Sequence, residues 1–173
     1  MISNIHLMSE SEKKQKSNSI FLSLQNLLKY SLGMGSGEWG CFQPLSIEPQ
    51  IEFHNISDIQ WCYPRTETGK LRFYSGCQNF KNSSFNVLEP TDGSLIDLNQ
   101  MTGLCVPALA FHPEGYRLGR GKGFYDQAFS QFLGTKIGLC FDFCVSSDVP
   151  YEAHDLKMDY IITDLQVLHT GEK

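Results

Sequence analysis

The 173-residue sequence has no long hydrophobic run, and this absence limits where the chain can reside. A helix that crosses a bilayer needs roughly 18 or more consecutive apolar residues, and no such stretch occurs. The N-terminal residues MISNIHLMSESEKKQK also lack the apolar segment of a secretory signal. We therefore expect a cytoplasmic protein.

Positive charge is also scarce. The formal net charge is −5, whereas proteins that bind nucleic acid or membrane surfaces are usually basic, so we expect neither as a partner. The sequence contains only four arginines: Arg65, Arg72, Arg117 and Arg120. Two of them lie within residues 117–126, which makes this stretch locally basic in an acidic chain.

The sequence has no CxxC motif and no set of Cys and His residues at zinc-binding spacing. The six cysteines lie mostly in apolar, strand-like contexts, which predicts buried free thiols. They are Cys41, Cys62, Cys77, Cys105, Cys140 and Cys144.

The N-terminal half predicts one amphipathic helix followed by short strands. Ser9 and Glu12 have the spacing of a capping box, and Phe21, Leu24 and Leu28 recur at helical intervals. Several glycines then break the pattern. We predict short strands at 39–45, 58–63 and 71–74, and an extended loop over 78–100.

The C-terminal half shows a clearer order of elements. Residues 103–111 are nearly all apolar, as in a strand buried on both faces, and residues 123–133 have the periodicity of a helix. Two further buried strands are predicted at 136–143 and 159–163. Strand, glycine-rich turn, helix and strand is the α/β order, so we predict a single α/β domain with a mostly parallel sheet.

The turn between the first strand and the helix of this half has the composition of a phosphate-binding loop. In GYRLGRGKGFYD, at 115–126, Gly119, Gly121 and Gly123 alternate with basic residues. Alternating glycines allow positive φ angles and close approach of a ligand, and successive N–H groups can bind an anion. The loop lacks the GxGxxG and GxxxxGK[ST] spacings, and the alternative is a basic surface loop.

Two aspartates near this loop are candidate magnesium ligands. Asp126 follows the glycines directly, and Asp155 lies in a second acidic cluster that also contains Asp159. Magnesium prefers one or two carboxylates together with phosphate oxygens. Asp126 could instead interact with the helix dipole, and we expect Asp159 and His154 to be structural.

These segments resemble a known family. VPALAF at 106–111, the GYRLGRGKGFYD loop and VP…HDLKMD at 149–159 closely resemble the signature of the 5-formyltetrahydrofolate cyclo-ligases. Tyr63-Pro64-Arg65 and Glu48 resemble further family positions. The resemblance implies a Rossmann-like, mostly parallel sheet flanked by helices, of the sugar-phosphate-isomerase type.

The resemblance also implies the activity: 5-formyltetrahydrofolate and ATP would give 5,10-methenyltetrahydrofolate, ADP and phosphate, with Mg²⁺ bound by Asp126 and Asp155. Arg120 and Lys122 would be catalytic, as a clamp on the transferred charge. The ATP-binding residues would be Arg117, Leu118, Gly119, Arg120, Gly121, Lys122, Gly123, Phe124 and Tyr125. The folate-binding residues would be Gln43, Glu48, Arg120, Gly121, Lys122, Gly123 and Phe124.

The sequence departs from the family pattern at three places. The family's N-terminal basic helix, which adds cations to the ATP site, has no equivalent here, His112 stands where Asp is common, and Phe124 replaces a tyrosine. We expect a monomeric enzyme, with Trp39, Phe42, Trp61 and Phe124 as candidates to line the pterin ring. The alternatives are a non-catalytic folate- or nucleotide-binding relative and a sugar-phosphate isomerase or binding module of the same architecture.

Overall fold

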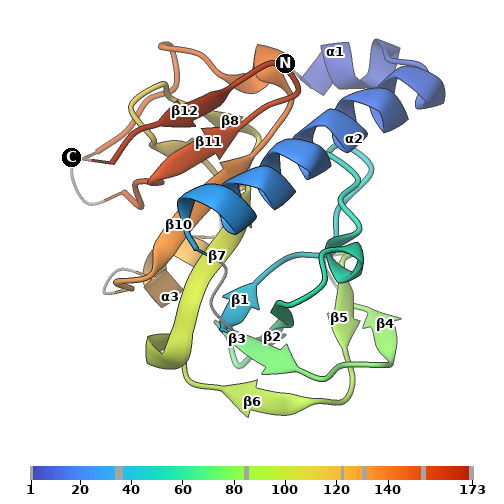
Figure 1. The fold of residues 1–173 in the computed structure, drawn as a ribbon, viewed down its shortest axis with the longest axis vertical. Coiled ribbons are helices and arrows are strands. Elements are labelled where there is room, and N and C mark those ends of the chain that lie inside the picture. The colour runs from blue at the N-terminus through green and yellow to red at the C-terminus, as the bar shows by residue number, and fades with distance from the viewer. Residues whose placement is uncertain are drawn as a thin grey trace.

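The computed structural model describes residues 2–33, 37–83, 86–121, 123–129, 132–152 and 155–171. One eight-stranded sheet runs through the molecule in the order β12-β11-β10-β7-β1-β2-β3-β6 (Figure 1). The helices and strands are α1 Ile2–Leu7, α2 Glu10–Asn26, η1 Leu27–Ser31, β1 Glu38–Gly40, η2 Phe53–Asn55, β2 Gln60–Glu67, β3 Lys70–Ser75, β4 Phe80–Asn82, β5 Leu88–Pro90, β6 Ser94–Ile96, η3 Leu98–Gln100, β7 Met101–Pro107, β8 Ala110–Phe111, β9 Arg117–Leu118, α3 Phe124–Phe129, β10 Thr135–Leu139, η4 Asp142–Cys144, β11 Tyr160–Ile162 and β12 Val167–His169.

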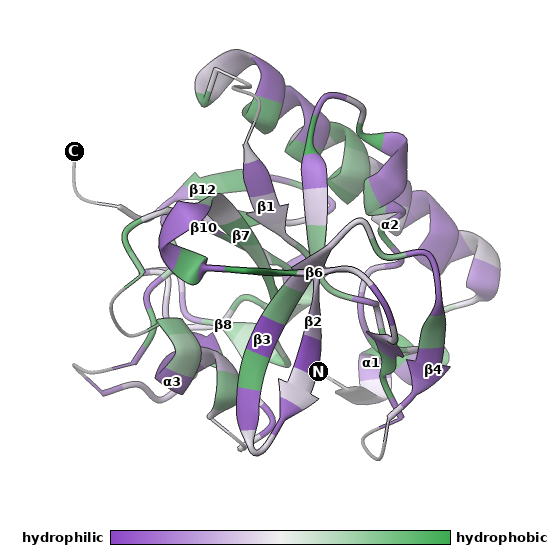
Figure 2. Ribbon diagram, turned by 90° about the horizontal axis from the view of Figure 1, so that it is seen from below, coloured by the Kyte–Doolittle hydropathy of each residue, from purple (hydrophilic) through white to green (hydrophobic). Residues whose placement is uncertain are grey.

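The strands from β11 to β2 are all parallel to their neighbours, whereas β12, β3 and β6 join antiparallel at the two edges. The predicted α/β class with a mostly parallel sheet is therefore confirmed for the centre of the sheet, and the sheet as a whole is mixed. The helices α2 and α3 lie on opposite faces of it, as the two views show (Figures 1 and 2). None of the helices in the described part of the chain is long and apolar enough to cross a membrane.

The predicted N-terminal helix is present with its predicted cap. Ser9 Oγ accepts a hydrogen bond from the backbone N–H of Glu12 at 3.1 Å, and α2 begins at the next residue, Glu10. Leu24 and Leu28 are buried in the core beneath the helix. The chain continues past α2 as a π-helical turn, η1, which carries Leu27 and Leu28 together into the core.

The centre of the sheet is packed tightly enough that some positions admit only glycine. The Trp39 ring of β1 lies directly over Gly103 of β7, and a Cβ atom at Gly103 would overlap that ring. Leu104, Cys105 and Val106 of β7 have no exposed surface. The predicted buried strand therefore occupies the middle of the molecule, although it ends at Pro107 and residues 110–111 form the separate strand β8.

Several predicted boundaries were wrong. β2 runs through Pro64 to Glu67 instead of ending at the proline. β1 ends opposite Cys62, so beyond that point β2 pairs only with β3. Its other side is an edge, where the missing N–H group of Pro64 breaks no strand hydrogen bond. Residues 78–100 were predicted as a loop but contain β4, β5, β6 and η3. The strand predicted at 39–45 is only β1, and that predicted at 136–143 ends at Leu139 and is followed by η4.

The helix predicted at 123–133 is described as α3, Phe124–Phe129, with residues 130–131 outside the described part. Phe129 and Phe132 are buried, whereas Leu133 is 98% exposed and does not share their environment. The cysteines agree with the prediction: all six are free, and Cys77 alone among them is not buried.

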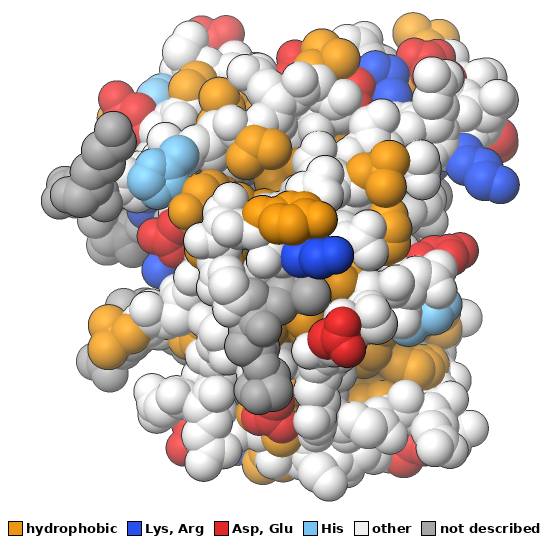
Figure 3. Space-filling view, viewed as in Figure 1, with side chains coloured by type: hydrophobic (Ala, Val, Ile, Leu, Met, Phe, Trp, Pro, Cys, Tyr) orange, Lys and Arg blue, Asp and Glu red, His pale blue; other side chains and the backbone are white. Residues whose placement is uncertain are grey.

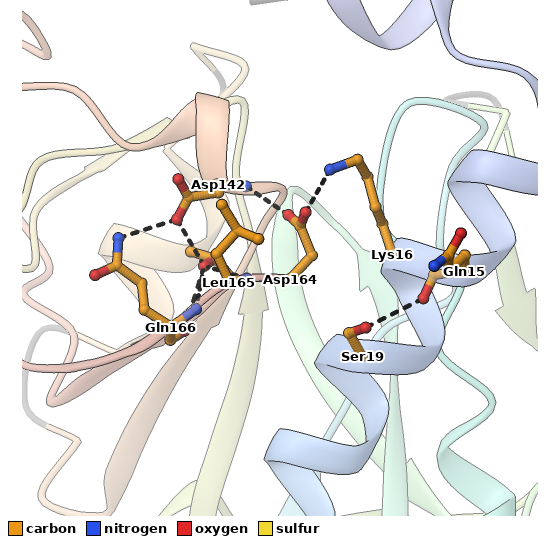
Figure 4. Close-up of polar contacts among 8 residues, drawn as sticks. Gln15, Lys16, Ser19, Asp142, Asp164, Leu165 and Gln166 are labelled. Carbon is orange, nitrogen blue, oxygen red and sulfur yellow. Dashed lines mark hydrogen bonds and ion pairs between the residues drawn. The ribbon is translucent and has the colours of Figure 1, made fainter.

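The surface carries charges of both signs. On the face shown in Figure 3, acidic and basic side chains of the described residues are interspersed with apolar ones. Lys16 Nζ of α2 forms an ion pair at 2.5 Å with Asp164 Oδ2, which follows β11 and whose side chain is 3% exposed (Figure 4). The second Asp164 oxygen accepts the backbone N–H of Asp142 at 2.8 Å.

Candidate functional site

A cavity of about 330 Å³ lies beside the carboxyl ends of β1 and β7. In open α/β sheets, ligands bind at this edge. Segments far apart in the sequence form its wall, because the chain enters it after β1, along β2 and β3, at β5, after β7 and from β9 to α3. The lining residues are Phe42, Gln43, Leu45, Glu48, Pro64, Thr66, Leu71, Val87, Glu89, Pro107, Ala108, Arg117, Gly119, Arg120, Gly123, Phe124 and Tyr125.

The glycine-rich loop forms one side of this cavity, and its glycines serve two purposes. Gly121 and Gly123 have φ angles of +77° and +64°, which is the left-handed region that glycine adopts without strain. At Gly119 the backbone passes close to Arg117 instead, since a Cβ atom there would lie 2.9 Å from Arg117 Nη1 and would displace that group. The loop backbone therefore closes tightly around a guanidinium group.

That guanidinium group is held from two sides. Arg117 Nη2 and Nε donate to the two carboxylate oxygens of Asp126, at 2.8 and 3.2 Å, in a bidentate ion pair. The same group lies 5.1 Å from the centre of the Tyr125 ring. Only 5% of the Arg117 side chain is exposed, so little water screens its charge. Asp126 is therefore the group that neutralises much of this charge. Burial also raises the pKa of the Tyr125 hydroxyl above its ordinary value.

Glu48 lies in the same cavity and is 6% exposed. Its Oε2 accepts the backbone N–H of Leu45 at 2.9 Å, and its Oε1 lies 3.7 Å from Arg120 Nη2. Burial raises the pKa of the Glu48 carboxyl, although the Leu45 N–H and the Arg120 charge oppose this rise. A carboxylate with so little water around it is ready to accept hydrogen bonds from a bound ligand.

Contacts from α2 fix the turn that carries Glu48. Lys13 Nζ donates to the carbonyl of Ser46, and the backbone N–H of Gln50 donates to Ser17 Oγ at 3.0 Å. The Gln50 amide bridges the turn by donating to the carbonyls of Leu45 and Glu48, at 2.7 and 2.8 Å. Lys13 is therefore a structural residue of this turn.

The structure separates the four aromatic candidates into two pairs. Phe42 and Phe124 line the cavity, although Phe42 also belongs to the core and is 3% exposed, whereas Trp39 and Trp61 are core residues that do not line it. Trp39 covers Gly103, and Trp61 packs against Phe53 with 4.9 Å between ring centres.

Most of the predicted ligand-binding residues meet at this cavity. Those that line it are Gln43, Glu48, Arg117, Gly119, Arg120, Gly123, Phe124 and Tyr125. Leu118 pairs with Ala110 in the β8–β9 hairpin, and Gly121 lies exposed in the loop without lining the cavity. Lys122 and His154 lie outside the described residues.

The two predicted metal ligands lie on different elements. Asp126 is on the first turn of α3, and Asp155 lies before β11, where its Oδ2 accepts the Glu152 N–H at 2.7 Å. In the described part of the chain, no three His, Cys, Asp or Glu side chains gather as a metal cluster. A carboxylate has about four acceptor positions, so Asp126 keeps capacity beside Arg117. Asp126 alone would supply one carboxylate to a magnesium ion that shares a nucleotide's phosphates, and Asp155 does not line this cavity.

One buried carboxylate of the cavity wall was not predicted from the sequence. Glu89 is 8% exposed and lines the wall at β5, and its Oε1 accepts the backbone N–H of Thr66 at 3.2 Å. The only signal in the sequence is a lone glutamate before Pro90, inside a polar segment that was predicted to be a loop.

Comparisons with known proteins agree with this architecture. Residues 47–164 match the family model described as the 5-formyltetrahydrofolate cyclo-ligase family. The 5-formyltetrahydrofolate cyclo-ligase of Mycoplasma pneumoniae is 30% identical over 116 residues, which cover 66% of this chain and 62% of that protein. The mouse protein of the same name is 29% identical over 90 residues, which cover 46% of this chain and 44% of that protein.

A solved structure extends the likeness to the whole fold. The 5,10-methenyltetrahydrofolate synthetase of Aquifex aeolicus superimposes with a TM-score of 0.80 at 24% identity, covering 99% of this chain and 90% of that one. The aligned segments span less than two thirds of the mouse and Mycoplasma sequences, but the family match covers more than half of this chain and contains most of the cavity wall. The chain that builds this cavity belongs to the 5-formyltetrahydrofolate cyclo-ligase family.

Proposed function

We propose that the chain converts 5-formyltetrahydrofolate to 5,10-methenyltetrahydrofolate in an ATP- and Mg²⁺-dependent reaction that releases ADP and phosphate. The observation that carries this proposal is the single cavity in which Gln43 and Glu48 face the glycine-rich loop of Arg117–Tyr125. In this proposal a folate site lies beside a nucleotide site, as direct phosphoryl transfer between the two substrates requires.

The proposed reaction needs no nucleophile from the protein. The formyl oxygen attacks the γ-phosphorus of ATP, and the bond to ADP breaks, which leaves an imidate phosphate on N5. N10 then attacks the formyl carbon and loses its proton, and phosphate departs as the ring closes. Phosphoryl transfer of this kind depends on positioning and charge neutralisation.

Several groups at the cavity have a task in this scheme. Glu48 and Gln43 orient the pterin, and the flat faces of Phe42 and Phe124 pack against it. Arg120 is 45% exposed at the cavity, so its guanidinium can move from Glu48 to the transferred phosphoryl group. Lys122 supplies the second cation of the clamp. Magnesium, when bound by Asp126 and Asp155, would neutralise phosphate charge. Arg117 positions the loop, because its own charge is paired with Asp126.

The pairing of Arg117 with Asp126 also favours a second candidate, a folate- or nucleotide-binding relative without turnover. The pair leaves fewer free cations for a triphosphate than the loop sequence suggests. Turnover separates the two functions. We expect purified protein with 5-formyltetrahydrofolate, ATP and Mg²⁺ to generate the methenyl chromophore, and we expect no product when ATP is omitted or the metal is chelated. Binding of both ligands without product would support the second candidate.

A pair of arginine variants tests the site itself. Arg120 and Arg72 are equally exposed, at 45%, and each lies near one glutamate, at 3.7 and 3.5 Å. We expect Arg120→Gln to lower kcat about 100-fold, the usual effect of removing one donor to a transition-state charge. Arg72→Gln is the matched control. Its kcat should stay within about twofold of the wild-type value, because this variant loses only one surface ion pair. Equal effects of the two variants would remove Arg120 from the clamp.

A further inference from the structure

Glu89 is a buried carboxylate in the cavity that the proposed reaction leaves without a task. It belongs to β5, is 8% exposed and stands on the wall beside Thr66 and Val87. Its Oε1 accepts the Thr66 N–H at 3.2 Å. A carboxylate has about four acceptor positions, so this single bond leaves most of its capacity unused.

Within the described part of the chain, no ion pair includes Glu89. The nearest cation by strand register is Lys81, directly opposite Glu89 in the β4–β5 ladder, but Lys81 is exposed and forms no ion pair there. Withdrawing a carboxylate from water is costly unless its acceptors are filled. Such a group on a cavity wall is suited to a ligand that brings hydrogen-bond donors.

The rest of the cavity specifies what kind of ligand this is. Much of the wall is apolar, from Phe42, Leu45, Pro64, Val87 and Pro107, and the second carboxylate, Glu48, lies on the turn after β1. A flat, largely apolar molecule with N–H groups on more than one edge satisfies both carboxylates. Reduced folates have this chemistry, because they carry N–H donors on the pyrimidine ring and on the atoms that link it to the aminobenzoyl group.

We propose that Glu89 is a second folate-recognition residue, which accepts a hydrogen bond from an N–H group of the reduced folate while Thr66 fixes its other oxygen. This inference rests on the proposed function and adds to it a contact on the β5 side of the cavity, separate from Glu48. Glu89 thereby selects for ligands that present a donor at this wall.

Glu89→Gln separates recognition from structure. The side-chain carbonyl of the introduced glutamine still accepts the Thr66 N–H, so a purely structural role predicts no change, whereas loss of the charge weakens a charged hydrogen bond to the ligand. We expect the Kd for 5-formyltetrahydrofolate, measured by calorimetry without ATP, to rise about 10-fold or more. The Tm should not fall, because the variant loses a poorly solvated charge, and the KM for ATP should remain near its wild-type value. Glu52→Gln, at an exposed glutamate outside the cavity, is the matched control and should leave the Kd unchanged.

An unchanged Kd in Glu89→Gln overturns the proposal. If this variant fails to fold, carbodiimide labelling of Glu89 in the wild type decides the question: 5-formyltetrahydrofolate should block the labelling, and undiminished labelling overturns the proposal. Wild-type turnover, measured in parallel, distinguishes a failure of this inference from a failure of the proposed function. A chain that turns over but is insensitive to Glu89→Gln retains the proposed function and loses only this contact, and a chain that neither binds nor converts the folate loses both.

Discussion

The carboxyl group of Glu48 lies where little water reaches it. Among the described residues, the Leu45 N–H and the Arg120 guanidinium at 3.7 Å favour its negative charge, and burial outweighs them, so the pKa is raised. A raised carboxyl pKa means that the ionised form costs folding free energy at neutral pH. A residue that is unfavourable for stability but well placed for a ligand is common at functional sites.

Glu48→Gln should therefore stabilise the protein and impair binding. The folded state holds the Glu48 proton more tightly than the unfolded chain, whose value is near 4.5, so the penalty is present above the folded-state pKa and disappears as the pH falls toward 4.5. We expect a higher Tm for the variant at pH 7, by about 2–4 °C for each kcal/mol gained, and a smaller difference near pH 4.5. We also expect a Kd for 5-formyltetrahydrofolate about 10-fold higher.

The pH series is the control for this residue. A variant that is destabilised at pH 7, or whose advantage grows as the pH falls, would show that the Leu45 and Arg120 contacts outweigh burial. The two readouts are independent, since thermal unfolding is measured without ligand and binding by calorimetry on folded protein.

At the scale of elements, α2 positions the turn of Glu48 without contributing a side chain to the cavity wall. Gln50 bridges both ends of this turn through the Leu45 and Glu48 carbonyls, and its own N–H is held by Ser17 of α2. The turn therefore has a fixed shape only while these contacts hold.

Gln50→Ala should loosen the turn. We expect the KM for 5-formyltetrahydrofolate to rise about fivefold, with the KM for ATP unchanged and a loss of stability of only about 1 kcal/mol, because the Gln50 side chain is exposed and water replaces its bonds. Asn55→Ala is a suitable control, since Asn55 is also an exposed amide and donates to Glu52 at 2.7 Å without touching the turn. Steady-state kinetics that change equally in both variants would argue against a positioning role.

The sequence predicted those elements whose pattern is local. The Ser9 cap, the apolar stripe of α2 and the buried run around Val106 are readable because each depends on residues close in the chain. The three-residue strands β4, β5 and β6 were not, because they are short, they lie within a mostly polar segment, and long-range pairing defines them. Propensity has little weight in so short a strand.

The same distinction applies to the site. The glycine-rich loop is a contiguous signal, and its placement at the cavity was expected, whereas Glu89 reaches the cavity only because β5 packs beside β2. The neutralisation of Arg117 by Asp126 was equally invisible, since nothing in the spacing distinguishes a metal ligand from the partner of an ion pair. The tryptophans were indistinguishable from the two cavity phenylalanines for a similar reason: the composition of a segment does not tell which of its side chains border a cavity.

At the scale of the whole molecule, one ion pair fastens the first long helix to the last part of the sheet (Figure 4). Asp164 is 3% exposed and is held by Lys16 at 2.5 Å, while Asp142 and Gln166 extend the network along the far edge. Removing one partner of such a pair leaves a poorly solvated charge, although the Asp142 N–H continues to satisfy one Asp164 oxygen.

Lys16→Met should lower the free energy of unfolding by about 1–3 kcal/mol, which denaturant titration can measure. The Asp164 hydrogen bond raises the pKa of Lys16 above its ordinary 10.5, so the contribution of the pair is complete below pH 10.5 and is lost as the pH rises through the folded-state value. The difference between variant and wild type should accordingly shrink at strongly alkaline pH. Lys14→Met, at an exposed position of the same helix, should be nearly neutral. A comparable loss in both variants would mean that helix composition, not the ion pair, is responsible.

The contact between Trp39 and Gly103 has a consequence for how this chain can diverge. The two residues occupy one volume at the junction of β1 and β7, where even a methyl group on residue 103 would overlap the indole. A descendant that gains a side chain at position 103 must first, or simultaneously, exchange the tryptophan for something smaller. Substitutions at these two positions should therefore be correlated, so that a change at one of them is accompanied by a change at the other.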